Sequence, residues 1–236
     1  MSIGKEIFAL QSALGYEFID ITYLENALTH SSYSNEQKSR GISIESNERL
    51  EFLGDAILQS VISKYLYKNY KKYTEGVLTK MRQYLVCEKT LSKIAAEIDL
   101  GDYLNLGKGE ETNGCRRRPK VLADALEAVF AAVYLDSADA QETHERVLLS
   151  LFDDTLRGLD ASFEEDYKTM LQQLVEKDGA AELVYEVISE AGPEHNKRFT
   201  VVAFVNNNEV GRGEAKNKKD AEMQAAKVAL ELFGIM

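Results

Sequence analysis

The spacing of the apolar residues changes near residue 160, and this change limits the chain to a fold with two dissimilar parts. Over residues 1–150, apolar side chains recur at every third or fourth position, which is the spacing of an amphipathic helix. The stretches 91–101 and 121–136 show this spacing most clearly, and the whole chain holds only two prolines. We therefore expect residues 1–156 to form an all-α domain.

The C-terminal residues predict a small α+β domain. Gly, Ser and acidic residues interrupt the helical spacing after residue 156, so we place a linker at 157–164. A domain over 165–236 then follows, and the run "VNNNEV" favours a hairpin in it because Asn tolerates positive φ. Its expected order is α-β-β-β-α, with a helix at 167–177, strands within 183–192 and 198–216, and a closing helix at 218–234.

Composition argues against several classes of protein. No run of eighteen apolar residues occurs, and the N-terminus lacks the apolar core of a signal peptide, so we expect a cytoplasmic protein without a membrane span. Cys87 and Cys115 lie far apart and only three histidines occur, so neither a disulfide scaffold nor a Cys/His zinc site is expected. The net charge of −11 argues against nonspecific nucleic-acid binding, but it leaves room for a local basic patch and for metal ions.

Two predicted helices carry carboxylates beside apolar residues. In "NERLEFLGDAIL" (47–58), Glu51 and Asp55 lie about 40° apart on one helix face, and Glu48 lies one turn earlier. The expected core stripe of this helix lies on another face and consists of Leu50, Leu53, Ile57 and Val61.

The second helix, within 121–136, repeats this design. Asp124 and Glu127 lie roughly opposite its apolar stripe, which consists of Leu122, Leu126, Val129 and Val133. Their neighbours are small, so another helix or a substrate can come close on that side; these neighbours are Ala123, Ala128 and Ala131.

Two interpretations of these acids follow from spacing alone. They are either two ordinary solvated helix faces or one cation site. If the faces converge, acids about 5 Å apart at an effective dielectric constant near 20 repel by ~3 kcal/mol per pair. Such a site would take up protons or bind cations, and oxygen ligands alone would favour Mg²⁺ or Mn²⁺.

The stretch "NERLEFLGDAIL" closely resembles the signature of the ribonuclease III family. Further blocks match the family in the same order, and the C-terminal part resembles its double-stranded-RNA-binding domain. These blocks are "ALTHSSYSNE" (27–36), "EGVLTKMR" (75–82) and "VLADALEAVFAAVYLD" (121–136). The resemblance covers nearly the whole chain and is that of a compact, bacterial-type enzyme.

This resemblance implies a homodimer that cleaves double-stranded RNA with Mg²⁺ and leaves 5′-phosphates and short 3′ overhangs. It implies processing of ribosomal and messenger RNA precursors. The implied ligands of two divalent ions are Glu51, Asp55, Asp124 and Glu127. Asp55 and Glu127 are the expected catalytic residues, and Phe52 is expected to help the dimer interface. Glu48 and Glu75 also match family acids, and each could equally be an ordinary structural acid.

One position departs from the family. Lys120 stands where a small Ser is frequent, and it lies four residues before Asp124 on the same face. It could pair with Asp124, contact RNA phosphate or point to solvent. The neighbouring Arg116, Arg117 and Arg118 could equally contact phosphate or form a mobile basic loop.

The C-terminal part offers candidate RNA contacts, since A-form RNA is recognised mainly by its shape, phosphates and 2′-hydroxyls. The expected contacts are Thr169, Gln172, His195, Asn196, Lys216, Lys218 and Lys219. Residues 163–236 nevertheless carry nine Lys and Arg against fourteen Asp and Glu. We therefore expect one basic face and modest, salt-sensitive binding.

Two other functions compete with the nuclease. One is a catalytically idle double-stranded-RNA-binding scaffold, which the presence of all four carboxylates disfavours. The other is a helical metal-binding or interaction protein unrelated to RNA, which the expected α-β-β-β-α tail disfavours.

Overall fold

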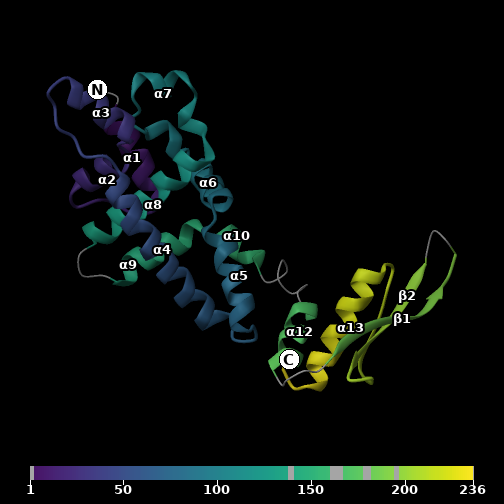
Figure 1. The fold of residues 1–236 in the computed structure, drawn as a ribbon. Helices are drawn as coiled ribbons and strands as arrows, with labels where there is room; N and C mark the ends of the chain where they lie inside the picture. The colour runs from purple at the N-terminus through teal and green to yellow at the C-terminus, as the bar shows by residue number, and fades with distance from the viewer. Residues whose placement is uncertain (1–2, 138–140, 160–166, 178–181, 194–196, 236) are drawn as a thin grey trace. The chain divides into compact units, whose positions relative to one another are not determined.

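The computed structural model describes residues 3–137, 141–159, 167–177, 182–193 and 197–235 (Figure 1). The chain divides into two compact units. We call Met1–Asn69 with Lys80–Arg157 the helical unit, and Tyr70–Thr79 with Gly158–Met236 the mixed unit. Each unit is described by itself below.

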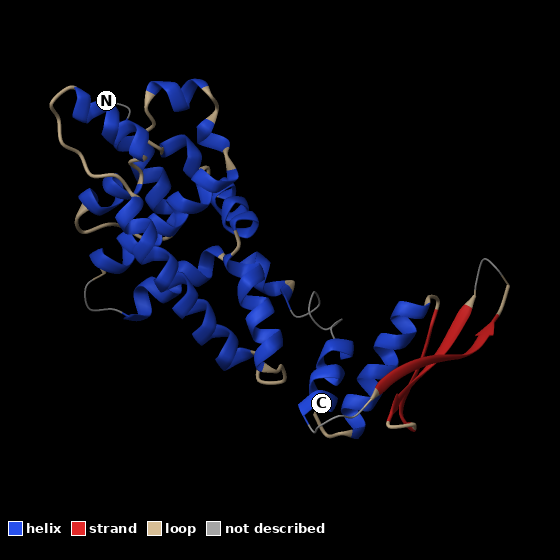
Figure 2. Cartoon of the chain, in the orientation of Figure 1, coloured by secondary structure: helices blue, strands red, loops and turns tan. Residues whose placement is uncertain are grey.

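The N-terminal part of the chain is helical, as predicted, and Figure 2 shows its helices in blue. Within the described residues it holds no strand, only an isolated bridge between Thr29 and Asn105. Its elements are α1 (Ile3–Leu14), α2 (Ile21–Ala27), α3 (Ser31–Ser39), α4 (Glu48–Asn69), α5 (Glu75–Val86), α6 (Glu88–Glu97), η1 (Leu100–Tyr103), α7 (Lys108–Thr112), η2 (Cys115–Arg117), α8 (Pro119–Asp136), α9 (Gln141–Leu151) and α10 (Asp153–Arg157).

Helix α8 lies at the centre of the helical unit, where it contacts α2, α4 and α6. The predicted stripe of Leu and Val is buried, and so are the alanines on the side of the acids. Helix α4 packs against α8, and its closest approach is to the backbone of Glu127. The helix predicted over 91–101 is α6, which begins earlier, at Glu88. It also ends earlier, at Glu97, because the backbone at Asp99 turns left-handed with φ of 53°.

The crossing of α4 over α8 depends on Gly54. A Cβ atom on Gly54 would lie 1.9 Å from the backbone oxygen of Glu127, so only glycine allows this approach. The predicted core stripe of α4 is therefore partly wrong. Leu53 and Ile57 are only half-buried, because the helix turns Gly54 toward α8; the buried face consists of Leu50, Gly54, Leu58, Val61, Ile62 and Leu66.

The other end of α8 anchors the N-terminal segment. The carboxylate of Asp136, a residue only 6% exposed, accepts hydrogen bonds from the Tyr16 hydroxyl (2.7 Å) and from the backbone N–H groups of Ile19 (2.8 Å) and Asp20 (2.7 Å). Burial, followed by this hydrogen bond, raises the pKa of Tyr16. A buried carboxylate is tolerated here because its oxygens are satisfied by donors.

The C-terminal domain has the predicted order α-β-β-β-α. It consists of α12 (Tyr167–Lys177), β1 (Leu183–Ala191), β2 (Arg198–Val205), β3 (Asn208–Ala215) and α13 (Lys218–Leu232). The strands form an antiparallel sheet in the order β1-β2-β3, shown in red in Figure 2. Asn206 and Asn207 turn the β2–β3 hairpin with φ of 48° and 63°, which confirms the prediction from "VNNNEV".

Close packing also sets the position of α13 on the sheet. A Cβ atom on Gly211 of β3 would lie 2.1 Å from the backbone oxygen of Ala225. The helix presents small residues to the strands, among them Ala221, Ala225 and Ala229, all fully buried. Helix and strand therefore approach closely along this contact.

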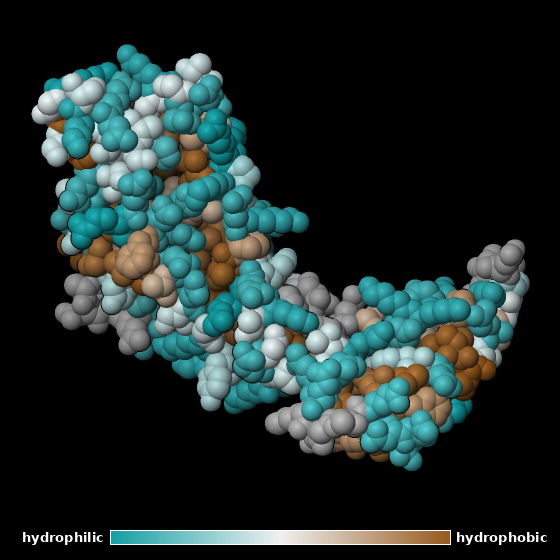
Figure 3. All heavy atoms as spheres, in the orientation of Figure 1, coloured by the Kyte–Doolittle hydropathy of each residue, from teal (hydrophilic) through white to brown (hydrophobic). Residues whose placement is uncertain are grey.

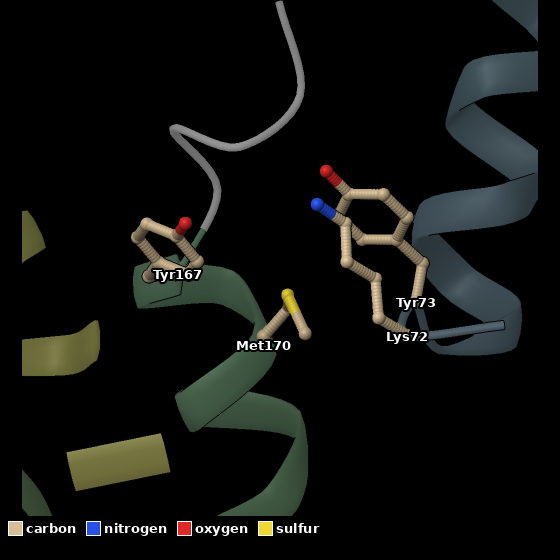
Figure 4. A pocket seen from close by; sticks show the side chains of 4 residues that line it. All are labelled: Lys72, Tyr73, Tyr167 and Met170. Atoms are coloured by element: carbon tan, nitrogen blue, oxygen red, sulfur yellow. The ribbon is translucent and has the colours of Figure 1, made fainter. Parts of the chain in front are cut away.

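A narrow pocket lies within the mixed unit, lined by Lys72, Tyr73, Tyr167 and Met170 (Figure 4). Its lining is almost wholly apolar, and the Lys72 ammonium lies 5.0 Å from the centre of the Tyr73 ring. The pocket has no room for a water molecule, so it is a gap in packing rather than a binding site.

Within the described residues, no helix is long and apolar enough to cross a membrane.

We expect Gly54→Ala to lower the free energy of unfolding by about 2 kcal/mol, because overpacking at a tight contact costs ~1–3 kcal/mol. Chemical denaturation followed by circular dichroism measures this change. Gly109→Ala in α7 is the matched control, since a Cβ atom there meets open space. Equal stability of the two variants would show that the crossing tolerates a methyl group.

Candidate active site

The crossing of α4 and α8 brings four carboxylates into one electrostatic group, which we call the acid cluster: Glu51, Asp55, Asp124 and Glu127. Burial, followed by the charges of Asp55, Asp124 and Glu51, raises the pKa of Glu127 to about 8. Burial and the charge of Asp124 likewise raise the pKa of Glu51. The two helix faces therefore lie close enough for their charges to act on one another, and the interpretation as a cation site stays a prediction.

Both aspartates of the acid cluster are held by a side chain four residues away. The Gln59 amide nitrogen lies 2.9 and 3.1 Å from the two carboxylate oxygens of Asp55. The Lys120 ammonium lies 3.3 and 3.1 Å from the two carboxylate oxygens of Asp124. Of the three roles considered for Lys120, the structure shows the ion pair with Asp124. The role of Gln59 was missed, although its i,i+4 spacing from Asp55 was a signal.

The donor chemistry of the acid cluster fits a divalent ion. Four carboxylates supply hard oxygen ligands, and their mutual repulsion at a half-buried site favours a cation. Among the residues that the structure describes, no three acidic, His or Cys side chains are yet arranged to hold a metal ion. The contacts of Asp55 with Gln59 and of Asp124 with Lys120 occupy the oxygens of two of the four acids.

The two accessory acids differ in their surroundings. Glu48 is exposed at the start of α4, accepts a hydrogen bond from Ser46 at 3.1 Å, and contributes to the raised pKa of Glu51. It therefore lies at the edge of the acid cluster. Glu75 begins α5 and accepts a hydrogen bond from Thr79 at 2.8 Å, which is a local contact within the first turn of that helix.

Each of the three arginines before α8 forms an ion pair with an acidic side chain. Arg116 pairs with Glu111 and donates to the backbone oxygens of Gly101 (2.5 Å) and Leu104 (2.9 Å), so it ties η1 to η2. The other two guanidinium groups form more exposed pairs: Arg117 with Asp102 at 3.5 Å and Arg118 with Glu110 at 3.1 Å.

Helix α4 also presents an apolar face beside the acids. Phe52 is 81% exposed, and its neighbours Leu53 and Ile57 are half-buried. Figure 3 shows several hydrophobic patches over the helical part of the chain. A large exposed aromatic residue next to a functional cluster is typical of a protein interface.

The predicted RNA contacts lie on two helices of the C-terminal domain. Thr169 is half-buried on α12, whereas Gln172 is exposed there and donates to Glu176 at 2.7 Å. Lys216, Lys218 and Lys219 are exposed around the start of α13, where Asn217 caps the helix by accepting from the Asp220 backbone N–H at 2.8 Å. His195 and Asn196 lie outside the described residues.

Acidic side chains neutralise part of this basic surface. Glu190 lies 2.9 Å from the Lys218 ammonium and 3.0 Å from that of Lys197. Among the described residues, Lys216 and Lys219 have no such ion pair. Lys216 and Lys219 can therefore contact a phosphate directly, whereas Lys218 would first have to leave Glu190.

Comparison with known proteins agrees with both parts of the fold. A family model described as ribonuclease-III-like matches residues 20–154, and the double-stranded RNA binding motif matches residues 167–232. The chain is 46% identical to "Ribonuclease 3" of Caldanaerobacter subterraneus subsp. tengcongensis over 231 residues, which cover 96% of this chain and 98% of that protein.

Solved structures give the same result for the helical part. The nuclease domain of ribonuclease III from Campylobacter jejuni is 40% identical with a TM-score of 0.57, and covers 64% of this chain and 96% of that chain. A second structure of that domain has a TM-score of 0.56 at 40% identity over 62% of this chain and 95% of that chain. It is described as flexible in a region involved in dimer formation. The chain therefore belongs to the ribonuclease III family and is an endoribonuclease with an appended double-stranded-RNA-binding domain.

Proposed function

We propose that this enzyme cleaves double-stranded RNA with Mg²⁺, or Mn²⁺ in its place, held by Glu51, Asp55, Asp124 and Glu127. The observation that carries the proposal is the electrostatic convergence of these acids, which raises the pKa of Glu127 to about 8. A group with this pKa is mostly protonated at pH 7, and binding of a cation would release the proton. The products are expected to carry 5′-phosphates and short 3′ overhangs.

The acids of this site have different proposed roles. Divalent ions, when bound, supply an activated water and stabilise the leaving oxygen. Asp55 and Glu127 are the proposed catalytic residues, because they come from opposite sides of the α4–α8 crossing and repel each other through a half-buried space. Glu51 and Asp124 complete the ligand set, and Glu48 adds negative charge at its edge.

The proposed substrates are ribosomal and messenger RNA precursors, processed in the cytoplasm. A domain that reads A-form shape and phosphates suits such duplex regions, since it needs little sequence information. The proposed contacts are Thr169, Gln172, His195, Asn196, Lys216, Lys218 and Lys219. The competing function, an idle RNA-binding scaffold, is disfavoured because all four carboxylates are present.

We further propose that the enzyme acts as a homodimer through α4. The support is the exposed Phe52 beside Glu51, which would leave water on contact with a second copy. The nuclease domain of the Campylobacter jejuni relative is described as having a region involved in dimer formation, which supports the dimer itself. A dimer would also let two RNA-binding domains act on one duplex.

Cleavage of a long RNA duplex tests the central proposal. With Mg²⁺ we expect cleavage that a chelator abolishes, and a loss of about 10²–10⁴-fold in Asp55→Asn and Glu127→Gln, because each removes several kcal/mol of charge stabilisation. Glu97→Gln on α6 is the control acid, since its partner is Lys93 outside the acid cluster. Duplex binding without cleavage under any divalent ion would instead support the scaffold.

Sedimentation equilibrium tests the dimer. We expect Phe52→Asp to shift the protein from dimer to monomer at micromolar concentration, because burying an unpaired carboxylate at an interface is strongly unfavourable. Phe8→Asp, at another exposed aromatic residue, is the control and should leave the dimer intact. A Phe52→Asp variant that sediments as the wild type would place the interface elsewhere.

The salt dependence of duplex binding tests the basic turn at α13. In the cleavage-deficient Asp55→Asn protein, binding should weaken steeply with salt, and Lys219→Ala should reduce the log–log slope by about one phosphate contact. Lys227→Ala is the control, because Lys227 lies about two turns further along α13, with its ammonium 5.5 Å from the centre of the Tyr167 ring. Equal slopes for both variants would remove Lys219 from the contact surface.

A further inference from the structure

Lys120 occupies the place of a cation beside the acid cluster. It is the second residue of α8, after Pro119, and its ammonium lies 3.1 Å from one carboxylate oxygen of Asp124 and 3.3 Å from the other. Both oxygens that Asp124 could offer to a metal ion are therefore engaged by a side chain of the same helix.

The charge of Lys120 reaches beyond Asp124. Its positive charge also attracts the carboxylates of Glu51 and Glu127, so it acts on three of the four acids. Gln59 engages the fourth acid, Asp55, but it is neutral and cannot offset charge. Lys120 is thus a positive charge that the chain itself supplies to the acid cluster.

We propose that Lys120 is an internal counter-cation of the metal-free enzyme, which competes with divalent ions for Asp124 and so raises the ion concentration needed to fill the site. This inference rests on the metal-dependent function proposed above. It concerns the affinity for the ion rather than the cleavage step.

The competition is necessarily mild. The Lys120 side chain is 73% exposed, and an exposed ion pair is screened by water, so a metal ion can displace it without a large penalty. Displacement of Lys120 would still remove the attraction between its ammonium and three acids. We expect this to weaken metal binding by about three- to tenfold.

Direct titration of the metal-free full chain with Mn²⁺, followed by electron paramagnetic resonance of the free ion, measures this effect without RNA. Lys120→Met should bind Mn²⁺ about three- to tenfold more tightly than the wild type, whereas Lys120→Arg, which keeps the charge, should stay within about twofold. Lys93→Met is the matched control, because Lys93 also pairs with a carboxylate four residues away on a helix, Glu97 on α6. It should leave the affinity unchanged.

The outcomes separate this inference from the proposed function. Measurable Mn²⁺ binding with no gain in Lys120→Met, or with an equal gain in Lys93→Met, would overturn the role of Lys120 and leave the metal site standing. No Mn²⁺ binding by any variant, the wild type included, would overturn the proposed metal site and this inference with it. Thermal unfolding of each variant confirms that all of them are folded before they are compared.

Discussion

The close crossing of α4 over α8 is the contact on which the nuclease part of the chain depends. Gly54 meets the backbone of Glu127 at a distance that no side chain would allow. The same contact fills the core with the buried face of α4 and brings the carboxylates of two helices into one group. One helix crossing therefore determines both the packing of the core and the position of the acids. The acids of α4 lie beside apolar residues because the adjacent face of the same helix is buried in the core.

Once the helices cross, the charge of the acid cluster must be balanced. Burial and mutual repulsion raise the pKa of Glu127, so part of the negative charge is removed by a proton. Lys120 contacts the carboxylate of Asp124, and Gln59 that of Asp55, each from one turn away on the same helix. The chain thus balances the charge of its acids with a proton and with donors from its own helices.

In the C-terminal domain, acidic side chains neutralise part of the positive charge that could bind RNA. Its acids exceed its basic residues, yet several of them pair with lysines, as Glu190 does with Lys197 and Lys218. Such pairs reduce the positive surface that RNA can use and leave Lys216 and Lys219 exposed near a helix start. Weak attraction by each domain would make a pair of domains in a dimer the effective binding unit.

The sequence by itself determined the features that depend on neighbours along the chain. Helix α12 has the predicted bounds, the asparagine turn forms where positive φ was expected, and the stripe of α8 is buried. The four acids were also predicted from the motifs, and their role as metal ligands stays a prediction. Only the tertiary structure decided the rotation of α4, the pairing of Lys120 and the use of Arg116 to join η1 to η2. These features depend on which part of the backbone lies opposite a given side chain. Helical spacing shows which residues share a face of a helix. It does not show which face meets a neighbouring helix so closely that only glycine fits.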